Sequence, residues 1–286
     1  MLLGMSVLPG QVAASGEDIE VIVTQEDGME CVLVTFEGNV DWEPIGNIPE
    51  TGINMPGSWM TTSWGPFENE PSPESVALFL NYNSAEILFN DPICAVSIYY
   101  ASWVPVTFTA YDQDGNVLAS IWVNGNSVGG VLEAWDSICV DVGENIITRA
   151  VIVGGALQTI IDDLKVCRIA YEALIDIKPE CEPNSINLDA QGNVPVAIFS
   201  TADFDATTID PATVTLAGAA VKLRGKSDSP QSSLKDINGD GLTDLLVHIV
   251  IDGLELELGS TEAELEGWTY GNAKVYGSDS VNIVPA

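Results

Sequence analysis

The sequence is short of basic residues. Its 286 residues include 42 Asp and Glu, nine Lys and Arg and one histidine, which gives a formal net charge of −33. Phosphate backbones and anionic membrane surfaces are bound by clusters of Lys and Arg, and the chain contains no such cluster. This composition argues against nucleic acid and lipid headgroups as partners. Long apolar runs are also missing, because no run after the N-terminal segment reaches the roughly 18 residues that predict membrane insertion.

The shortage of basic residues is greatest in the first half of the chain. The first Lys or Arg is Arg149, and residues 1–148 contain 21 Asp and Glu. A carboxylate in this stretch has no basic partner from the same stretch, so it must face water, accept backbone hydrogen bonds or bind a cation. Two compatible explanations stay open. One is a generally acidic surface that resists aggregation, and the other is the binding of divalent metal ions at a few sites.

Residues typical of catalytic sites are equally scarce. The only histidine, His248, lies among the apolar residues 246–250, which favours a packed, hydrogen-bonded side chain over a catalytic one. The sequence has no P-loop, no GxGxxG or HExxH motif and no cluster of zinc ligands. The composition therefore favours a protein without catalytic activity. Glycoside hydrolysis needs only two carboxylates, so a hydrolase acting on polysaccharides remains an alternative.

The N-terminal residues predict export from the cell. Residues 1–14 read MLLGMSVLPGQVAA, an apolar segment ending in small residues that is typical of a secretory signal peptide. The positive charges that normally begin such a peptide are missing. We therefore expect residues 1–16 to be a signal-peptide remnant ahead of an extracellular protein, with a short buried strand as the alternative.

Five cysteines without CxxC spacing argue against a zinc site. They are Cys31, Cys94, Cys139, Cys167 and Cys181. In an oxidising compartment the simplest arrangement is two disulfides and one free thiol. Cys31 and Cys167 lie near the two ends of the first domain, where the terminal strands of a β-sandwich are often neighbours, so we expect this pair. Cys94 would then pair with Cys139; the alternative is that the thiols are reduced and buried.

The pattern of apolar residues predicts an all-β fold. Short runs that alternate or are rich in β-branched residues are typical of strands, and they occur at residues 31–36, 95–100, 104–110 and 146–153. Residues 112–116, DQDGN, predict a tight hairpin turn. No amphipathic helix longer than about three turns is evident. We expect two β-sandwich domains, one over residues 17–170 and one over residues 171–286.

Three segments of the first domain form an ordered pattern, namely residues 34–38, 108–118 and 161–164. With this pattern the domain resembles the jelly-roll, galactose-binding-like modules of secreted bacterial and archaeal proteins. It implies a jelly-roll module that is usually non-catalytic and often holds a structural calcium ion between its first and last strands. Carried onto this sequence, the ligands would be Glu37 and Asp162 or Asp163. A hard cation there would relieve the repulsion between carboxylates on adjacent terminal strands.

An Asp-rich loop predicts a calcium site in the second domain. Oxygen-bearing side chains occupy positions 1, 3, 5 and 9 of residues 236–244, and a glycine occupies position 6. The predicted ligands are the side chains of Asp236, Asn238, Asp240 and Asp244 and the backbone carbonyl of Leu242. Such hard oxygen ligands select Ca²⁺. An EF-hand needs Glu at position 12, which is Val247 here, and the strand-like sequence that follows resembles instead the calcium loops of integrin-type propellers.

The second domain contains an ordered set of short segments, at residues 175–179, 184–187, 194–198, 203–205, 236–244 and 277–281. With this set it resembles an uncharacterised β-domain common at the C-termini of secreted microbial proteins. Glu180 and Cys181 depart from the pattern, since small residues are more usual there. The resemblance implies an extracellular accessory domain and gives no reaction.

Aromatic residues in the first domain suggest a sugar-binding role. Six of the seven tryptophans lie within residues 17–170, and sugars bind by stacking their apolar faces on aromatic rings. Trp59, Trp64 and Trp103 lie in or beside expected loops and are the predicted ligand-binding residues. Trp122 and Trp135 lie in apolar strands and are expected in the core. The alternative is that all six are core or interface residues.

Together these patterns predict a non-catalytic, extracellular, calcium-binding protein that binds carbohydrate or acts as an adhesin. One alternative is a calcium-dependent structural subunit of a surface layer or filament, whose partners are copies of itself. The other is the polysaccharide-acting hydrolase.

Overall fold

The structure is a computed structural model that describes almost all of the chain. It covers residues 19–285 except 27, 38–41, 43, 49–50, 64–68, 72–74, 80–82, 180 and 226–227. The described residues form strands, turns and two 3₁₀ segments of three residues each, without an α-helix, which confirms the all-β prediction. None of them forms a helix long and apolar enough to cross a membrane. The expected signal-peptide remnant lies outside the described residues.

The chain forms two compact units, divided between Ile169 and Ala170. The strands of unit 1 are β1 (Val21–Glu26), β2 (Met29–Val34), β3 (Pro44–Ile48), β4 (Ile53–Thr62), β5 (Val76–Phe79), β6 (Ser84–Ile93), β7 (Ala95–Ser102), β8 (Val106–Tyr111), β9 (Val117–Val123), β10 (Asp136–Asp141), β11 (Ile147–Val153) and β12 (Thr159–Glu172). The last three residues of β12 belong to unit 2.

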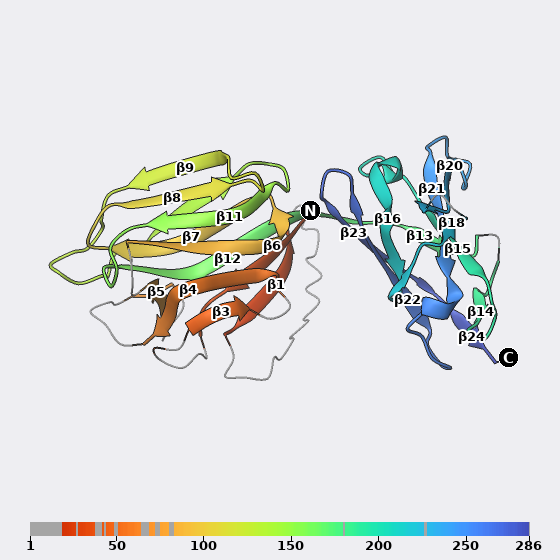
Figure 1. Ribbon diagram of the computed structural model, residues 1–286, viewed down its shortest axis with the longest axis horizontal. Helices are drawn as coiled ribbons and strands as arrows, with labels where there is room; N and C mark the ends of the chain where they lie inside the picture. The colour runs from red at the N-terminus through yellow and green to blue at the C-terminus, as the bar shows by residue number, and fades with distance from the viewer. Residues whose placement is uncertain are drawn as a thin grey trace, which may run out of the picture. The chain divides into compact units, whose positions relative to one another are not determined.

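Unit 1 is a sandwich of two antiparallel sheets. One sheet has the order β3-β4-β6-β11-β8-β9, and the other has the order β10-β7-β12-β2-β1. The short strand β5 pairs with both β4 and β12 and so joins the two sheets. Figure 1 shows β9, β8 and β11 running side by side. Both sheets contribute to one core, which includes Phe108 and Ile152 from the first sheet and Ile98 and Val166 from the second. The β-sandwich predicted from the alternating pattern is therefore confirmed for this part of the chain.

The hairpin between β8 and β9 forms as its sequence predicts. Asp112 Oδ1 accepts hydrogen bonds from the N–H groups of Asp114 at 2.9 Å and Asn116 at 2.8 Å. Gly115 has a φ of 82°, a conformation that glycine adopts without steric cost. These bonds satisfy the turn backbone, so β8 and β9 pair without a longer connection.

One of the two expected disulfides is present. Cys31 on β2 and Cys167 on β12 are cross-strand partners and are joined by a disulfide. Cys94 and Cys139 are both free thiols, so the second expected pair is wrong. The two thiols lie in different environments and do not meet. Cys94 is buried, with its Sγ 3.2 Å from the Cys167 carbonyl oxygen, whereas Cys139 is exposed on β10. Cys181 is free, as expected.

Unit 2 contains twelve further strands and two 3₁₀ segments. They are β13 (Ile175–Ile177), β14 (Ser185–Asn187), β15 (Asn193–Ile198), η1 (Ala206–Thr208), β16 (Ile209–Leu216), β17 (Ala219–Ala220), β18 (Leu223–Arg224), β19 (Ser229–Pro230), β20 (Ser232–Lys235), β21 (Asp244–Val250), η2 (Ile251–Gly253), β22 (Glu262–Thr269), β23 (Lys274–Ser280) and β24 (Asn282–Val284).

Unit 2 is also built from two principal sheets around one core. One has the order β13-β15-β21-β20, and the other has the order β17-β16-β22-β23 with the end of β12. Val196 and Val247 from the first sheet join Val214, Leu265 and Val275 from the second in a single apolar cluster. The short parallel pair β14–β24 lies outside these sheets. The Asp-rich loop connects β20 to β21, the edge pair of the first sheet.

Candidate functional site

The Asp-rich loop of residues 236–244 closes around the carboxylate of Asp236. This carboxylate accepts hydrogen bonds from Gly239 N at 2.7 Å and Gly241 N at 3.1 Å. The two glycines have φ angles of 80° and 93°, which side chains rarely tolerate, so the backbone can fold back toward Asp236. The first predicted ligand is thus held by the loop backbone.

Two further predicted ligands are held within the same loop. Asn238 Oδ1 accepts from Asp240 N at 3.0 Å, and Asn238 Nδ2 donates to Asp240 Oδ2 at 3.0 Å. Asp240 Oδ1 also accepts from Leu242 N at 2.8 Å. Each of these oxygens accepts one hydrogen bond and keeps a second lone pair. Both side chains are exposed, so an ion in solution could reach these lone pairs.

Asp244 differs from the other acidic residues of the loop because it is fully buried. It begins β21, and its carboxylate accepts from Ser200 N at 2.9 Å and from Ile237 N at 2.8 Å. Both oxygens therefore bind backbone N–H groups. This side chain fixes the start of the loop and the chain near Ser200 to β21, a structural role that the motif alone does not predict.

The second predicted metal site involves Glu37, Asp162 and Asp163 in unit 1. Glu37 Oε1 accepts from Ser75 N at 3.0 Å, directly before β5. β5 pairs with β12 at Ile161, directly before the fully buried Asp162. Asp163 has a φ of 48°, and its N–H donates to Asp162 Oδ1 at 2.8 Å. Glu37 and Asp162 therefore both lie near the start of β5. A calcium ion held by these residues stays a prediction.

Neither site is a cluster of acidic side chains alone. In the described part of the chain, no three His, Cys, Asp or Glu side chains are grouped so that they could hold a metal ion. Calcium also accepts amide and backbone carbonyl oxygens and water as ligands. The loop of residues 236–244 therefore requires the oxygens of Asn238 and Leu242 in addition to its carboxylates.

The predicted role of Trp59 as a sugar-stacking residue is wrong. Trp59 lies on β4 with 1% of its surface exposed, and its Nε1 donates to Glu86 O at 2.8 Å. Its ring packs edge-on against Phe79, with 5.5 Å between the ring centroids. Trp64 lies outside the described residues. Trp103 is half-buried and packs with Trp135 against a small apolar cluster.

Trp122 shows the opposite behaviour, and its expected place in the core is wrong. It lies on β9 with 61% of its surface exposed. Its strand neighbours Ile121 and Val123 pack against the core of unit 1, so Trp122 points outward. β9 is the edge strand of its sheet. An exposed tryptophan on the outer side of a regular strand is the most accessible large aromatic group in this sheet.

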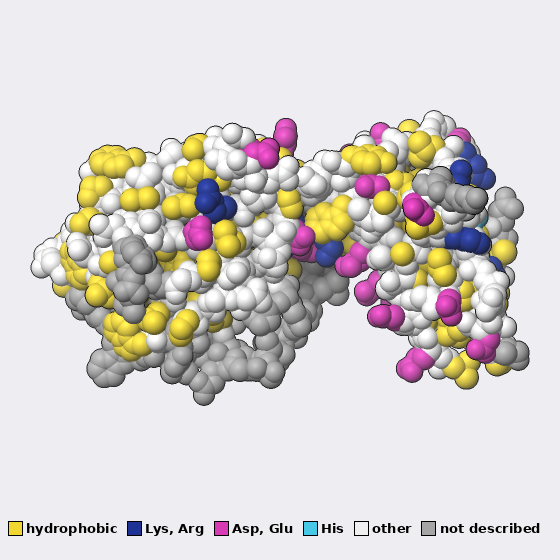
Figure 2. Space-filling view, in the orientation of Figure 1, with side chains coloured by type: hydrophobic (Ala, Val, Ile, Leu, Met, Phe, Trp, Pro, Cys, Tyr) yellow, Lys and Arg dark blue, Asp and Glu magenta, His cyan; other side chains and the backbone are white. Residues whose placement is uncertain are grey.

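The strand registers place Trp122 on a continuous outer surface, which we call the β9 face. Its residues are Ser84, Glu86 and Leu88 on β6, Arg149, Val151 and Val153 on β11, Thr107, Thr109 and Tyr111 on β8, and Ser120 and Trp122 on β9. Figure 2 shows hydrophobic side chains spread among uncharged ones over β8, β9 and β11, with one basic group beside an acidic group. The β9 face therefore combines apolar and polar surface.

The polar groups of the β9 face are oriented by one another. The Arg149 guanidinium lies over the Tyr111 ring, 4.4 Å from its centroid, and 3.8 Å from the Glu86 carboxylate. The exposed Ser120 hydroxyl is 2.8 Å from the hydroxyl of Thr109, which is buried. A guanidinium, a carboxylate and several hydroxyls thus surround the apolar side chains. Such a surface can stack on a ring and bind its hydroxyl groups.

His248 is hydrogen-bonded, as the sequence predicts, but it is half-buried on the outer side of β21 and is not packed into the core. Its Nδ1 lies 2.7 Å from Asn193 Nδ2. Partial burial, together with the charges of Arg224 and Lys222, lowers its pKa. The side chain is therefore neutral near pH 7.

Comparison with known proteins gives no family for this chain. No protein-family model matches it, and no curated protein matches its sequence. Among solved structures, the K2 cleaved adhesin domain of Lys-gingipain is 14% identical with a TM-score of 0.34, over 48% of this chain and 98% of its own. TmCBM61, solved with β-1,4-galactotriose, is 15% identical with a TM-score of 0.28, over 45% and 98%.

A third structure covers more of the chain. The tandem CBM22 domains of Paenibacillus barcinonensis Xyn10C are 9% identical with a TM-score of 0.28, over 95% of this chain and 88% of theirs. Scores of this size are not informative about a ligand or an activity. The function must therefore be argued from the residues of this chain.

Proposed function

We propose that unit 1 is a non-catalytic module that binds neutral carbohydrate through the β9 face. The observation that carries this proposal is the exposure of Trp122 on a regular strand. Exposing a tryptophan removes it from the core and gives up the stability that its burial would provide. A pyranose ring offers an apolar face of matching shape, and its hydroxyls suit the hydroxyl and charged groups around the ring.

The charge of the protein selects neutral sugars over acidic ones. The described basic residues of unit 1 are Arg149, Lys165 and Arg168, and each lies in an ion pair with Asp or Glu. With a net charge of −33, the protein repels uronic acids and sulfated glycans. Neutral polysaccharides such as glucans, galactans or xylans carry no such penalty.

Calcium at the loop of residues 236–244 forms the second part of the proposal. The ion stabilises unit 2 by binding the folded loop and not the unfolded chain. Extracellular calcium modules have dissociation constants of about 10⁻⁴–10⁻³ M. At about 100-fold excess of free calcium one site adds about 2.7 kcal/mol. Glu37 with Asp162 or Asp163 would hold a further structural ion in unit 1.

An extracellular location suits both parts of the proposal. The Cys31–Cys167 disulfide is stable in an oxidising compartment, and glycans and millimolar calcium are both found outside cells. Adhesion to a glycan-coated surface follows from the same binding activity.

The proposal is tested by glycan binding of the full chain. We expect the wild type to bind a subset of neutral polysaccharides in an affinity gel or glycan array. Trp122→Ala should weaken that binding by about tenfold or more, as truncation of a central aromatic contact typically does. Tyr99→Ala is the matched control, because Tyr99 is an exposed aromatic on β7 of the other sheet.

Several results would count against the proposal. Equal loss of binding in both variants, or no binding to any neutral glycan by the wild type, removes the β9 face as the site. Turnover of a bound polysaccharide would support the hydrolase alternative. Calcium-dependent growth of the particle size in gel filtration, without glycan binding, would support the structural-subunit alternative.

A further inference from the structure

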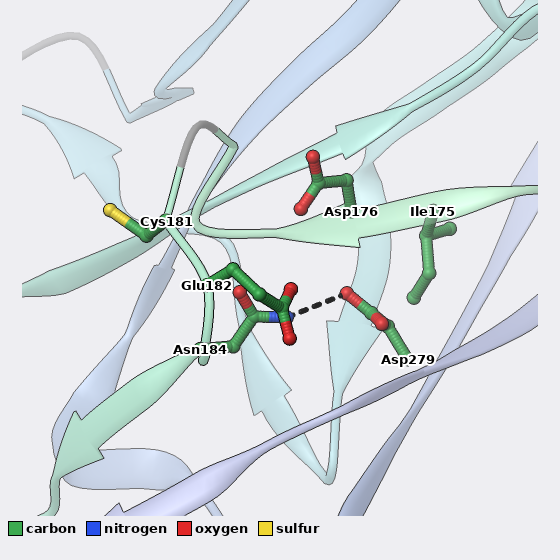
Figure 3. Close-up of a pocket in the computed structure, with 6 residues that line it drawn as sticks. All are labelled: Ile175, Asp176, Cys181, Glu182, Asn184 and Asp279. Atoms are coloured by element: carbon green, nitrogen blue, oxygen red, sulfur yellow. Dashed lines mark hydrogen bonds between the residues drawn. The ribbon is translucent and has the colours of Figure 1, made fainter.

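The stretch of residues 175–184 and the distant Asp279 on β23 meet at one pocket in unit 2. The pocket is lined by Ile175, Asp176, Cys181, Glu182, Asn184 and Asp279 and has a volume of about 370 Å³. It lies between β13, the turn of residues 181–184 and β23, as Figure 3 shows. These segments belong to the patterns 175–179, 184–187 and 277–281 that define the second domain in sequence. Neither the β9 face nor the Asp-rich loop explains them. We call this space the Asp176 pocket.

The Asp176 pocket concentrates negative charge. It is lined by the carboxylates of Asp176, Glu182 and Asp279, and by no Lys or Arg. Lys178, the nearest basic residue in sequence, donates instead to the Ser185 carbonyl at 2.6 Å. Partial burial raises the pKa of Asp176, and the charges of Asp279 and Glu182 raise it further. No described residue donates a hydrogen bond to the Asp176 carboxylate, so this charge lacks compensation from the part of the chain that the structure describes.

A buried amide oxygen independently points to a ligand. Asn184 is 3% exposed, and its Oδ1 is the one buried side-chain N or O atom of the described residues without a hydrogen-bond partner. Asn184 Nδ2 donates to Asp279 Oδ2 at 2.9 Å and to Ser280 O at 3.0 Å. These two acceptors fix the orientation of the amide, because the flipped amide would place oxygen against oxygen.

The residue that carries this oxygen lines the same pocket as the three carboxylates. Figure 3 shows Asn184 bonded to Asp279 through its nitrogen, with its oxygen on the side of the amide that faces the turn of residues 181–182. Buried polar atoms of folded proteins nearly always have a partner. An amide oxygen that only accepts needs a hydrogen-bond donor or a cation as its partner, and beside three carboxylates a cation would also offset their charge.

We propose that the Asp176 pocket binds a calcium ion through Asp176, Asn184 Oδ1 and Asp279, with Glu182 as a further ligand. All of these atoms are hard oxygens, in the mixture of carboxylates and amide carbonyl that Ca²⁺ prefers. Asp279 orients Asn184 through its Oδ2, which also accepts from Ile177 N at 2.8 Å, so the ion would bind Oδ1, which accepts from Ser280 N at 2.7 Å. The volume of the pocket leaves room for the water molecules that would complete six to eight ligands.

The acidic side chains do not by themselves form a metal site, because no three His, Cys, Asp or Glu side chains of the described residues are grouped so that they could hold a metal ion. Glu182 is exposed, so it would turn to reach an ion held by the other oxygens. The buried amide oxygen therefore forms the fixed part of the site. The ion would link β13 and β23 to the turn of residues 181–184, which lies between β13 and β14.

The test is calcium titration of the chelator-treated full chain by calorimetry. Asp176→Asn keeps the shape of the side chain and removes its charge. We expect this variant to lose one bound calcium ion per chain, or to bind it at least tenfold more weakly. Asp240→Asn, in the separate Asp-rich loop, should leave that binding step in place. The two variants therefore distinguish this pocket from the loop, and glycan binding through Trp122 is measured independently.

Thermal melting provides the control for folding. In chelator, Asp176→Asn should melt at or above the temperature of the wild type, because it removes a repelled charge. Adding calcium should raise the melting temperature of Asp176→Asn by less than it raises that of the wild type. An Asp176→Asn titration identical to that of the wild type would overturn the proposal, as would the absence of any calcium binding by a wild type that is folded.

Discussion

At the scale of single residues, the buried carboxylate of Asp244 makes two hydrogen bonds to backbone N–H groups, those of Ser200 and Ile237. Asp244→Ala would leave both donors without an acceptor, at a cost of about 1–3 kcal/mol for each buried group. We expect a total loss of about 2–5 kcal/mol in the free energy of unfolding. Urea denaturation in the presence of chelator measures it without any contribution from bound metal.

The control for this prediction is Asp240→Ala in the same loop. Asp240 is exposed and accepts hydrogen bonds only within the loop, so its loss should change stability in chelator by less than about 1 kcal/mol. In calcium both variants should lose the stabilisation that the ion provides. Equal effects of the two variants in chelator would contradict the structural role of Asp244.

His248 makes the stability of unit 2 depend on pH. Burial and the nearby charges of Arg224 and Lys222 lower its pKa in the folded state, so the unfolded chain binds the proton more tightly. Its contribution to stability is therefore complete above the unfolded pKa of about 6.5 and is lost as the pH falls. The expected result is a steeper decrease in unfolding free energy below pH 6.5 for the wild type than for His248→Gln. Parallel pH profiles would contradict it.

The two misassigned tryptophans show what the sequence can and cannot reveal at this scale. Trp122 and Ser120 are two positions apart and face outward on β9, whereas Ile121 and Val123 pack against the core. Counting every second residue along this strand would therefore have predicted that Trp122 is exposed. Trp59 follows Pro56 and Gly57, which suggest a turn. The structure continues β4 through them with Gly57 at a φ of 82°. That continuation depends on pairing with strands far along the chain.

At the scale of elements, the disulfide joins β2 to β12 across 136 residues of sequence. In the chain-entropy model such a long loop contributes about 4–5 kcal/mol, and removing a native disulfide typically costs about 2–5 kcal/mol. We expect Cys31→Ser with Cys167→Ser to lower the melting transition of unit 1. Calorimetry of the full chain should show the transition of unit 2 unchanged. Cys181→Ser, an exposed free thiol, is the control that should change neither transition.

The strands themselves were largely predictable because each is a short local pattern. The expected strands at 104–110 and 146–153 correspond to β8 and β11, and Pro105 lies directly before β8 rather than inside it. The Asp176 pocket was not predictable in the same way. Its carboxylates come from residues about 100 positions apart, and nothing local identifies Asn184 as the residue whose amide oxygen lacks a partner.

At the scale of the whole molecule, the net charge of −33 with only nine basic residues creates repulsion that favours the unfolded chain. Salt screens this repulsion over about 10 Å at 0.1 M and about 3 Å at 1 M. The melting temperature in chelator should therefore rise with NaCl concentration until the few ion pairs, such as Lys165–Glu26, are also screened. A fall in melting temperature over the same range would mean that those ion pairs dominate.

Calcium should stabilise the folded protein by more than its screening of charge repulsion explains. At equal ionic strength, CaCl₂ should raise the melting temperature above the value in NaCl, because an ion bound at a site stabilises the folded state according to its affinity. Asp240→Asn and Asp176→Asn should each reduce this difference in melting temperature between CaCl₂ and NaCl. The double variant should reduce it by approximately the sum of the two single effects, since the two sites share no residue. Equal melting temperatures in the two salts would mean that the acidity of the chain acts through general repulsion alone, and that neither group of oxygens binds calcium.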